Sequence, residues 1–359
     1  MRIKLGDKSI EMRAVWFENN IVKLIDQRYI PDKLEIFEAR SIDEVCFAIK
    51  EMVVRGAPAI GVTAAYGVAQ SAIYSLNSGL WNMDSIKKTI EDDGTKLKAT
   101  RPTAYDLFYA VDYIVNRIQH LVESRPERDV IREEILNIAE EYCNRIVDEC
   151  YHIGLNGAEL IKNNSRILTH CNAGALATVD YGTALAPMRI AKKQNKKFVV
   201  YVDETRPRLQ GAKLTSWELY NEDIEHYVIP DNAAGYYMAK GDIDIVIVGG
   251  DRVCANGDFA NKIGTYEKAV LAREHNIPFY VAVPRSSIDF HLQFGSQIKI
   301  ESRNGSEVRK VGDTQIIPEY ISVLNPAFDV TPAKFVTGYI TKWGIFKPEE
   351  IYKLQNEKI

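Results

Sequence analysis

Reactive side chains follow several short apolar runs in the second half of the chain. The run at residues 166–170 leads into Cys171, and the run at residues 243–248 leads into Asp251. Comparable polar stretches follow three further apolar runs, at residues 198–202, 226–229 and 278–283. Ligands of open α/β sheets bind beyond the carboxyl ends of the strands. If these runs are neighbouring strands, their polar ends form the rim of one active site.

A thiol and a carboxyl group on such a rim suit acid–base chemistry. A cysteine gains nucleophilic or basic character where positive charge or a helix start lowers its pKa. An aspartic acid can donate a proton where apolar surroundings keep it protonated, and the run before Asp251 can provide them. Spacing alone leaves other interpretations open, because Cys171 also suits a packed core and Asp251 also suits an ion pair with Arg252 or a helix cap. In a strand, the neighbouring His170 would point to the opposite face from Cys171.

A motif suited to negative charge lies in the first half of the chain, at Arg55-Gly56-Ala57-Pro58. Gly56 allows the backbone to approach a ligand closely, and Pro58 suits the first turn of a helix, whose N–H groups bind anions. Arg55 adds a fixed positive charge. The same small residues also pack helices tightly, so the motif by itself indicates phosphate binding only weakly.

The charge balance and the motif content disfavour several other classes of protein. Lys and Arg number 45 against 49 Asp and Glu, which is not the basic excess typical of a nucleic-acid surface. The sequence contains no G-x-x-x-x-G-K-[ST], no G-x-G-x-x-G after a strand and no H-E-x-x-H. Its six histidines are scattered, and its five cysteines form no C-x-x-C. We therefore expect no nucleic acid, no metal and no cofactor.

The same features predict a cytoplasmic protein that does not engage a membrane. The amino terminus lacks the apolar core of a signal peptide, and apolar runs such as residues 243–248 are far shorter than a membrane span. The odd number and wide spacing of the cysteines fit a reducing compartment. We interpret Cys46, Cys143, Cys150 and Cys254 as packing residues.

The hydrophobic pattern predicts an α/β protein. A hairpin is expected from residues 12–17 and 21–25, which flank Glu18-Asn19-Asn20. Residues 41–161 show the three-to-four spacing of buried helical stripes. After Asn164 the apolar runs alternate with helix-compatible segments, which is typical of a mainly parallel sheet covered on both faces.

The length of 359 residues favours two domains. The polar, proline-broken stretch Ser124–Asp129 is the expected connection between them. We predict a small amino-terminal β-plus-helical domain over residues 1–125 and a doubly wound, Rossmann-like α/β domain over residues 126–359.

Five segments, which occur in order along nearly the whole chain, resemble methylthioribose-1-phosphate isomerases. They are R-G-A-P-A-I-G-V-T-A-A-Y-G from Arg55, T-H-C-N-A-G-A-L-A-T from Thr169, D-E-T-R-P-R-L-Q-G-A-K-L-T from Asp203, G-D-R-V-C-A-N-G-D-F-A-N-K-I-G-T-Y from Gly250 and N-P-A-F-D-V-T-P from Asn325. The resemblance extends to isomerases of 5-deoxyribose 1-phosphate and ribose 1,5-bisphosphate, and to the regulatory subunits of initiation factor 2B. One departure is Ile298-Lys299-Ile300-Glu301-Ser302-Arg303, where the isomerases more often read I-P-I-E-E-R.

The resemblance implies an aldose–ketose isomerase of methionine salvage that forms a homodimer. It implies catalytic roles for Cys171 and Asp251, which match the family motifs. It also implies substrate contacts from seven residues: Arg55, Gly56, Ala57, Arg101, Gln210, Asn261 and Lys262. Asp203, Glu204 and Arg206 are expected to orient the rim or to form an ion pair.

The implied substrate, 5-methylthioribose 1-phosphate, carries its phosphate on the anomeric carbon, which blocks spontaneous ring opening. An acid must then protonate the ring oxygen, and Asp251 is the expected donor, with Cys171 as base or stabiliser. Transfer through an enediol and transfer of a hydride both remain open. The alternatives are an isomerase of 5-deoxyribose 1-phosphate or ribose 1,5-bisphosphate, or a regulatory subunit, which would not need both Cys171 and Asp251.

Overall fold

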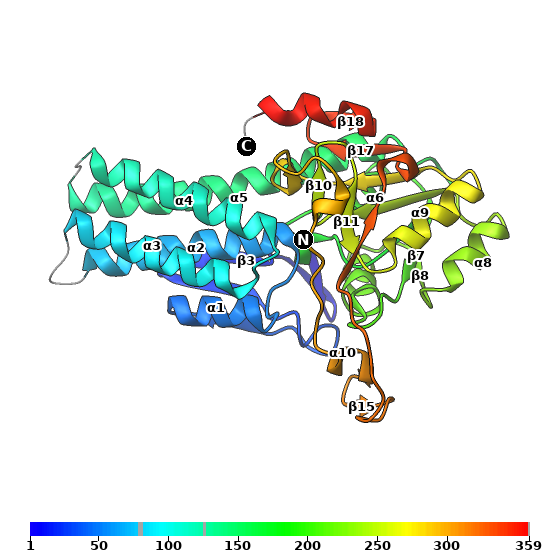
Figure 1. Ribbon diagram of the computed structural model, residues 1–359, viewed down its shortest axis with the longest axis horizontal. Helices are drawn as coiled ribbons and strands as arrows, with labels where there is room; N and C mark the ends of the chain where they lie inside the picture. The colour runs from blue at the N-terminus through cyan, green and yellow to red at the C-terminus, as the bar shows by residue number, and fades with distance from the viewer. Residues whose placement is uncertain (78–81, 125–126, 358–359) are drawn as a thin grey trace. The chain divides into compact units, whose positions relative to one another are not determined.

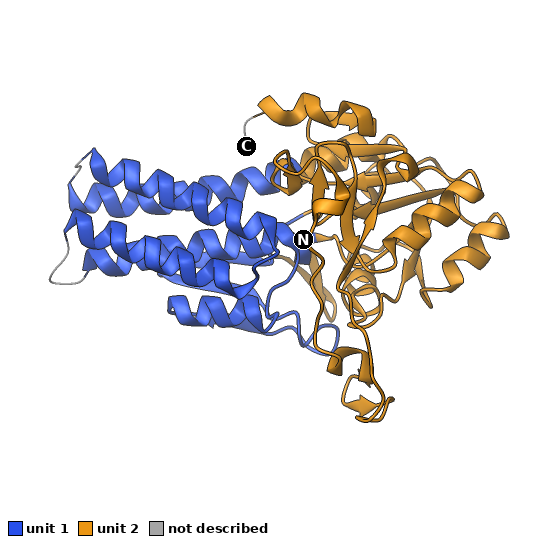
Figure 2. Ribbon diagram, in the orientation of Figure 1, with its two compact units in different colours: residues 1, 12–149, 175–180 blue, residues 2–11, 150–174, 181–359 orange. Residues whose placement is uncertain are grey.

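The computed structural model describes residues 1–77, 82–124 and 127–357. Contacts divide the chain into two compact units, coloured separately in Figure 2. Unit 1 consists of Met1, Met12–Glu149 and Ala175–Asp180, and unit 2 consists of Arg2–Glu11, Cys150–Gly174 and Tyr181–Ile359. The domain boundary predicted between residues 125 and 126 falls outside the described residues.

Unit 1 opens with an antiparallel sheet of three strands, β3 (Val15–Glu18), β4 (Ile21–Ile25) and β5 (Ile36–Ala39). Asn19 and Asn20 connect β3 to β4 with φ values of 54° and 61°. Two successive left-handed residues are what a tight hairpin turn requires, and asparagine tolerates this conformation better than most residues. The predicted hairpin is therefore confirmed.

α-Helices form most of the rest of unit 1 in the described part of the chain (Figure 1). They are α1 (Ile42–Lys50), α2 (Ala57–Asn77), α3 (Met83–Thr100), α4 (Tyr105–Glu123) and α5 (Arg128–Ala158), of which α5 continues into unit 2 from Cys150. Helix α1 is capped at its N-terminus by Ser41, whose side chain accepts a hydrogen bond from the Glu44 N–H. Helix α2 is buried along almost its whole length, because its many Ala and Gly residues allow neighbours to pack on all sides.

Unit 2 is built on a seven-stranded sheet with the order β18-β17-β12-β9-β6-β7-β8. The strands are β6 (Ser165–Thr169), β7 (Phe198–Asp203), β8 (His226–Ile229), β9 (Ile245–Gly249), β12 (Phe279–Ala282), β17 (Gly338–Thr341) and β18 (Gly344–Phe346). Only β18 runs antiparallel to its neighbour. All five predicted strands are present, and the strand order reverses between β6 and β9.

Alternate residues of β9 face two separate hydrophobic clusters. Val246 and Val248 pack in a cluster with residues of α8 (Ala233–Ala239) and α9 (Thr265–Glu274). Ile245 and Ile247 pack in a cluster with residues of α6 (Ala186–Lys193) and α7 (Ser216–Asn221). Helices thus cover both faces of the sheet, and the predicted doubly wound α/β fold is confirmed.

Several short strands of unit 2 after residue 250 were not predicted, whereas strands were expected within the first thirty residues. A second sheet has the order β13-β10-β11-β16, made by Ile288–Asp289, Arg252–Cys254, Phe259–Lys262 and Phe328–Thr331. Two small hairpins pair β1 (Arg2–Leu5) with β2 (Lys8–Glu11) and β14 (Lys310–Val311) with β15 (Thr314–Gln315). Strands of two to four residues are too short to show a periodic pattern in the sequence.

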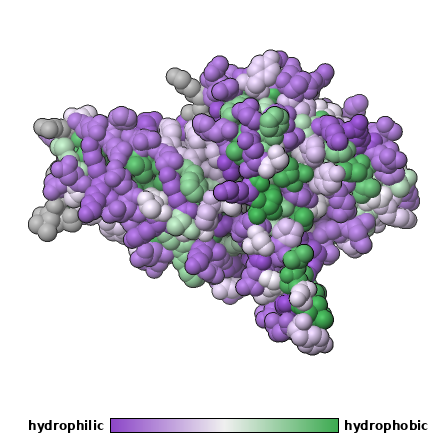
Figure 3. All heavy atoms as spheres, in the orientation of Figure 1, coloured by the Kyte–Doolittle hydropathy of each residue, from purple (hydrophilic) through white to green (hydrophobic). Residues whose placement is uncertain are grey.

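The segment around β14 and β15 exposes apolar side chains, which appear green on it in Figure 3. Tyr320 is 85% exposed and Leu324 is 92% exposed, and Ile316 and Ile321 are also exposed. Neighbouring exposed apolar residues are typical of surfaces that become buried by association. Among the helices of the described residues, none has the length and apolar character needed to cross a membrane.

Candidate functional site

Cys171 and Asp251 lie at the same edge of the large sheet. Strands β6 and β9 are parallel neighbours, with Ile167 paired to Ile245. Cys171 follows the last residue of β6 by two positions, and Asp251 follows the last residue of β9 by two positions. Because the strand order reverses between β6 and β9, both residues flank the point where doubly wound sheets bind their ligands.

The segments that carry Cys171 and Asp251 are in close contact. A Cβ atom built on Gly249 would lie 2.8 Å from the Cβ of Ala173. Any side chain larger than that of glycine at position 249 would therefore push the two segments apart. The segments that follow β6 and β9 therefore lie side by side, with Gly249 packed against the Ala173 side chain.

The backbone of Cys171 is held in a left-handed conformation, with φ of 66°. Such a conformation costs about 1–3 kcal/mol for a residue other than glycine and must be maintained by its surroundings. The Cys171 N–H donates to Thr205 Oγ1 over 2.8 Å, and the Cys171 carbonyl accepts from Thr215 Oγ1 over 2.7 Å. Cys171 is 9% exposed. Two threonine hydroxyl groups, one just after β7 and one at the end of the helical segment Gly211–Thr215, therefore hold the backbone of Cys171.

Asp251 follows a completely buried strand, β9. Its N–H donates to the carbonyl of Ala260 on β11 over 2.9 Å. The adjacent Arg252 donates from Nε to Asp289 Oδ2 over 2.9 Å. The charge of Arg252 is therefore directed to the buried carboxylate of Asp289, which is 1% exposed.

Three of the predicted substrate-binding residues lie in unit 2. Gln210 is 5% exposed, and its buried Oε1 accepts no hydrogen bond from the described residues. Asn261 and Lys262 end β11, where Asn261 Nδ2 donates to Thr265 Oγ1 over 3.0 Å and Lys262 Nζ donates to the Ala327 carbonyl over 2.8 Å. The N-P-A-F-D-V-T-P motif forms β16, which pairs directly with β11.

The other predicted substrate-binding residues lie in unit 1. Gly56 has φ of 100°, and a Cβ there would lie 2.4 Å from the backbone of Ala177. Only glycine fits this close approach, so the segment before helix α2 is fixed against the end of the Thr169–Thr178 motif. Arg55 Nε donates to Gln27 Oε1 over 3.2 Å, Ala57 begins α2, and Arg101 caps the end of α3.

A buried hydrogen bond joins His170 to Asp203. His170 Nδ1 lies 2.8 Å from Asp203 Oδ2, and Lys268 Nζ lies 3.7 Å from the same oxygen. Burial raises the pKa of Asp203, and the nearby His170 and Lys268 oppose that rise. The ion pair expected for Asp203 is therefore present. The sequence assigns no role to His170 or Lys268. The position of His170 beside Cys171 is the available signal, whereas a lysine in a helical segment gives none.

His170, Asp203 and Asp231 are close enough together to be considered as metal ligands. Most of their donor atoms are already engaged, although Asp203 Oδ1 is buried and accepts no hydrogen bond from the described residues. Asp231 accepts from the N–H groups of Thr205 and Arg206, each over 2.7 Å. His170 Nε2 faces the Ile263 carbonyl over 2.8 Å and so carries a hydrogen instead of an open lone pair. This chemistry fits a hydrogen-bonded cluster better than a metal site.

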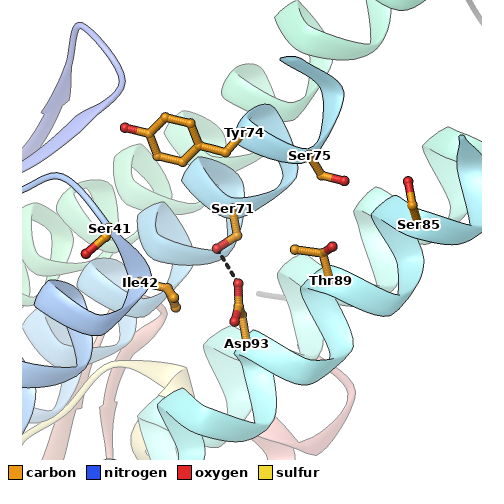
Figure 4. Close-up of a pocket in the computed structure, with 8 residues that line it drawn as sticks. All are labelled: Ser41, Ile42, Ser71, Tyr74, Ser75, Ser85, Thr89 and Asp93. Carbon is orange, nitrogen blue, oxygen red and sulfur yellow. Dashed lines mark hydrogen bonds between the residues drawn. The ribbon is translucent and has the colours of Figure 1, made fainter. Parts of the chain in front are cut away.

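A separate hollow of about 460 Å³ lies among helices α1, α2 and α3 of unit 1 (Figure 4). Its lining is rich in hydroxyl groups: Ser41, Ile42, Ser71, Tyr74, Ser75, Ser85, Thr89 and Asp93. Ser71 Oγ donates to Asp93 Oδ2 over 2.7 Å. No residue predicted to bind substrate is among these lining residues, so we do not assign the isomerase site to this hollow.

Comparison with known proteins gives two consistent results. The model of the Initiation factor 2 subunit family matches residues 53–348. Methylthioribose-1-phosphate isomerase from Roseiflexus sp. (strain RS-1) is 47% identical over 340 residues, which covers 95% of this chain and 96% of that protein. The same enzyme from Acetivibrio thermocellus is 48% identical, covering 94% of this chain and 97% of that protein.

Solved structures agree with these matches. The 5-methylthioribose 1-phosphate isomerase from Pyrococcus horikoshii OT3 has a TM-score of 0.86 and 43% identity, covering 96% of this chain and 95% of that one. The translation initiation factor eIF-2B, subunit delta, from A. fulgidus has a TM-score of 0.83 and 39% identity, covering 96% and 99%. The chain therefore belongs to the Initiation factor 2 subunit family and, within it, to the methylthioribose-1-phosphate isomerases.

Proposed function

We propose that this chain converts 5-methylthioribose 1-phosphate into 5-methylthioribulose 1-phosphate, an aldose–ketose isomerisation in methionine salvage. One observation carries the proposal: Cys171 and Asp251 both follow strands that flank the reversal of strand order, β6 and β9. A thiol and a carboxyl group at the ligand-binding edge are the two groups that the reaction needs. Relatives at 47–48% identity bear the name of this isomerase.

In the proposed mechanism, Asp251 donates a proton to the ring oxygen as the bond between that oxygen and carbon 1 breaks. One hydrogen then moves from carbon 2 to carbon 1, and the hydroxyl group of carbon 2 becomes the ketone as its proton returns to the Asp251 carboxylate, which restores the acid. The sum is an isomerisation, so no external oxidant or reductant is consumed. Cys171 acts at carbon 2, either as the base that removes the proton or as a group that stabilises a hydride shift.

The proposed substrate contacts combine positive charge with buried hydrogen-bonding groups. Arg55 and Arg101 supply guanidinium groups suited to phosphate, and Gly56 and Ala57 lie at the start of α2, whose N–H groups suit an anion. Gln210, Asn261 and Lys262 are all buried. The buried Gln210 Oε1, which accepts no bond from the described residues, is suited to a sugar hydroxyl.

The main alternative is a regulatory subunit without turnover, which the 39% identity to the A. fulgidus eIF-2B delta protein favours. A turnover assay separates the two functions. The purified chain should form the ketose 1-phosphate from 5-methylthioribose 1-phosphate, followed by ¹³C NMR at carbon 2. Binding of the sugar phosphate without formation of the ketose would instead support a regulatory or sensing role.

The homodimer implied by the resemblance is part of the same proposal. The exposed Tyr320 and Leu324 of the segment around β15 are consistent with a surface that becomes buried. Sedimentation equilibrium should give twice the mass of 40.6 kDa. A mass of one chain at assay concentration would contradict this part.

A further inference from the structure

His170 connects three loops of unit 2 through its two ring nitrogens. Nδ1 lies 2.8 Å from Asp203 Oδ2, and Nε2 lies 2.8 Å from the carbonyl oxygen of Ile263. His170 is 1% exposed and Asp203 is fully buried. A buried histidine with a partner at each nitrogen is fixed in both position and ring orientation. A shift of one of these loops would therefore move the His170 ring and, through its hydrogen bonds, the other loops.

The bond to Asp203 leads to the backbone of Cys171. The carbonyl of Asp203 accepts from Thr205 Oγ1 over 3.0 Å, and the same Oγ1 accepts from the Cys171 N–H over 2.8 Å. Since His170 directly precedes Cys171, the Asp203–Thr205 segment is attached to both residues. Loss of the hydrogen bond between the His170 ring and Asp203 would detach the Asp203–Thr205 segment from His170, while its link to the Cys171 N–H would remain.

The bond to Ile263 leads to the predicted substrate-binding residues. Ile263 directly follows Asn261 and Lys262. Gly264 has φ of 100°, and a Cβ there would lie 3.1 Å from Cε1 of His170, so the loop and the ring are in tight contact. The ring thus supports the loop that would hold the substrate.

Two further charged residues, Lys268 and Asp329, lie close to the contact between the His170 ring and the Ile263 loop. Lys268 is 1% exposed, and its Nζ lies 3.7 Å from Asp203 Oδ2. Asp329 accepts from the N–H groups of Gly264 and Tyr266 over 2.7 and 3.1 Å. Buried charges are tolerated where they are paired, as Lys268 and Asp203 Oδ2 are, whereas Asp203 Oδ1 accepts no hydrogen bond from the described residues.

We propose that His170 is a positioning residue, which ties the loop of Cys171 to the loop of Asn261 and Lys262. The inference rests on the proposed isomerase function for its kinetic consequences. The bond to Asp203 positions the thiol and hence sets kcat. The bond to the Ile263 carbonyl positions the substrate-binding loop and hence sets KM.

Two substitutions test the two hydrogen bonds of the His170 ring one at a time. His170→Asn keeps an amide near the position of Nδ1 and loses the reach to Ile263, so KM should rise about tenfold with little change in kcat. His170→Gln can reach the Ile263 carbonyl but not Asp203, so kcat should fall about 10–100-fold with little change in KM, because small displacements of reacting groups cost this much. Thr205→Val removes the bridge to Cys171 without altering the ring and should reproduce the loss in kcat.

Alkylation of Cys171 needs no substrate, so its rate tests the positioning role of His170 independently of the proposed isomerase activity. Iodoacetamide should alkylate Cys171 about tenfold faster in His170→Gln than in the original chain, while the fully buried Cys150 and Cys254 stay unmodified. His226→Asn is the matched control, because His226 Nδ1 bonds only locally, to the Ile224 carbonyl over 2.9 Å. It should leave kcat, KM and alkylation unchanged.

The outcomes separate clearly. If the original chain has no turnover but His170→Gln still exposes Cys171, the proposed function fails and the positioning role stands. If the original chain turns over and neither variant changes kcat, KM or the alkylation rate, the positioning role is overturned. Equal acceleration at Cys150 and Cys254 would indicate general loosening of unit 2 and would also overturn it.

Discussion

Arg252 binds the buried Asp289: Nε donates to Asp289 Oδ2 over 2.9 Å, and Nη2 contacts the same oxygen. An arginine held in this way is less able to fix a neighbouring carboxyl group in the ionised form. The sequence left an ion pair between Asp251 and Arg252 open as an alternative to catalysis. Asp289 is a partner of Arg252 that the sequence did not indicate, and the catalytic role of Asp251 stays a prediction.

The first prediction concerns Asp251 as the proton donor. Asp251→Asn should lower kcat by about 10²–10⁴, the usual range for loss of a general acid, whereas substrate affinity should be retained because the amide keeps the shape. Steady-state kinetics and calorimetric titration measure the two quantities. Asp242→Asn is the matched control. It alters a carboxylate that precedes the start of β9, whereas Asp251 follows the end of that strand. Turnover near that of the original chain in Asp251→Asn would refute the assignment.

The second prediction concerns Asp289. Asp289→Asn weakens the partner of Arg252, so the guanidinium group can turn towards Asp251 and compete for it. We expect kcat to fall about tenfold, less than in Asp251→Asn, and the loss should disappear when Arg252→Met is added. Double-mutant kinetics test this coupling. Additive losses in the double variant would show that Asp289 acts independently of Arg252.

The third prediction concerns the thiols. Cys171 is 9% exposed, whereas Cys143, Cys150 and Cys254 are fully buried. Burial raises the pKa of Cys254 to about 12 and that of Cys143 to about 11, so these thiols stay protonated and unreactive at pH 8. Alkylation should therefore inactivate the enzyme through Cys171, and substrate should protect it. Peptide mapping after partial inactivation tests this. Inactivation that follows Cys150 or Cys254 would contradict it.

Much of this site could be predicted because it lies at strand ends. The near-continuous apolar runs before Cys171 and Asp251 predict adjacent buried strands, and parallel strands bring their carboxyl ends to one edge. The role of His170 could not be predicted, since an alternating strand pattern places it on the opposite face from Cys171. The structure shows instead that β6 ends at Thr169, so neither residue continues the strand.

Other parts of the site depend on contacts between residues far apart in the sequence. Lys268 lies in α9 and reaches Asp203 at the end of β7, and no local pattern indicates this pairing. The small sheet that places Asn261 and Lys262 pairs β11 with β16, which lies about 70 residues later. Its strands have two to four residues, which is too few for a periodic signal.

The fourth prediction concerns stability at acid pH. The Asp258 carboxylate accepts from the N–H groups of Gly295 and Ala333 over 2.9 and 2.8 Å. Burial acts to raise its pKa, but the hydrogen bonds from Asn256, Ala333 and Gly295 prevail and lower it. A lowered pKa means stabilisation that is present above the ordinary value of 3.8 and is lost as pH falls below it. Asp258→Asn should therefore cost about 1–3 kcal/mol at pH 7 and less at pH 3, measured by denaturant unfolding. An equal cost at both pH values would contradict this.

The last prediction concerns the choice of substrate. The proposed contacts of Arg55, Arg101, Gln210, Asn261 and Lys262 all suit the phosphate and ribose that the candidate sugars share. Discrimination must therefore come from the group at carbon 5. Loss of the methylthio group changes transition-state binding by only about 1–3 kcal/mol, because an apolar pocket distinguishes small apolar groups poorly.

A second phosphate at carbon 5 behaves differently, because burial of an unpaired charge in an apolar pocket is strongly unfavourable. We therefore expect kcat/KM to be highest for 5-methylthioribose 1-phosphate and about 10–200-fold lower for 5-deoxyribose 1-phosphate. Ribose 1,5-bisphosphate should be the poorest of the three. Initial rates at limiting concentrations of each sugar, in one buffer and with one enzyme preparation, measure the order directly. A preference for the bisphosphate would require basic side chains around carbon 5 and would assign the chain a different substrate within the same reaction.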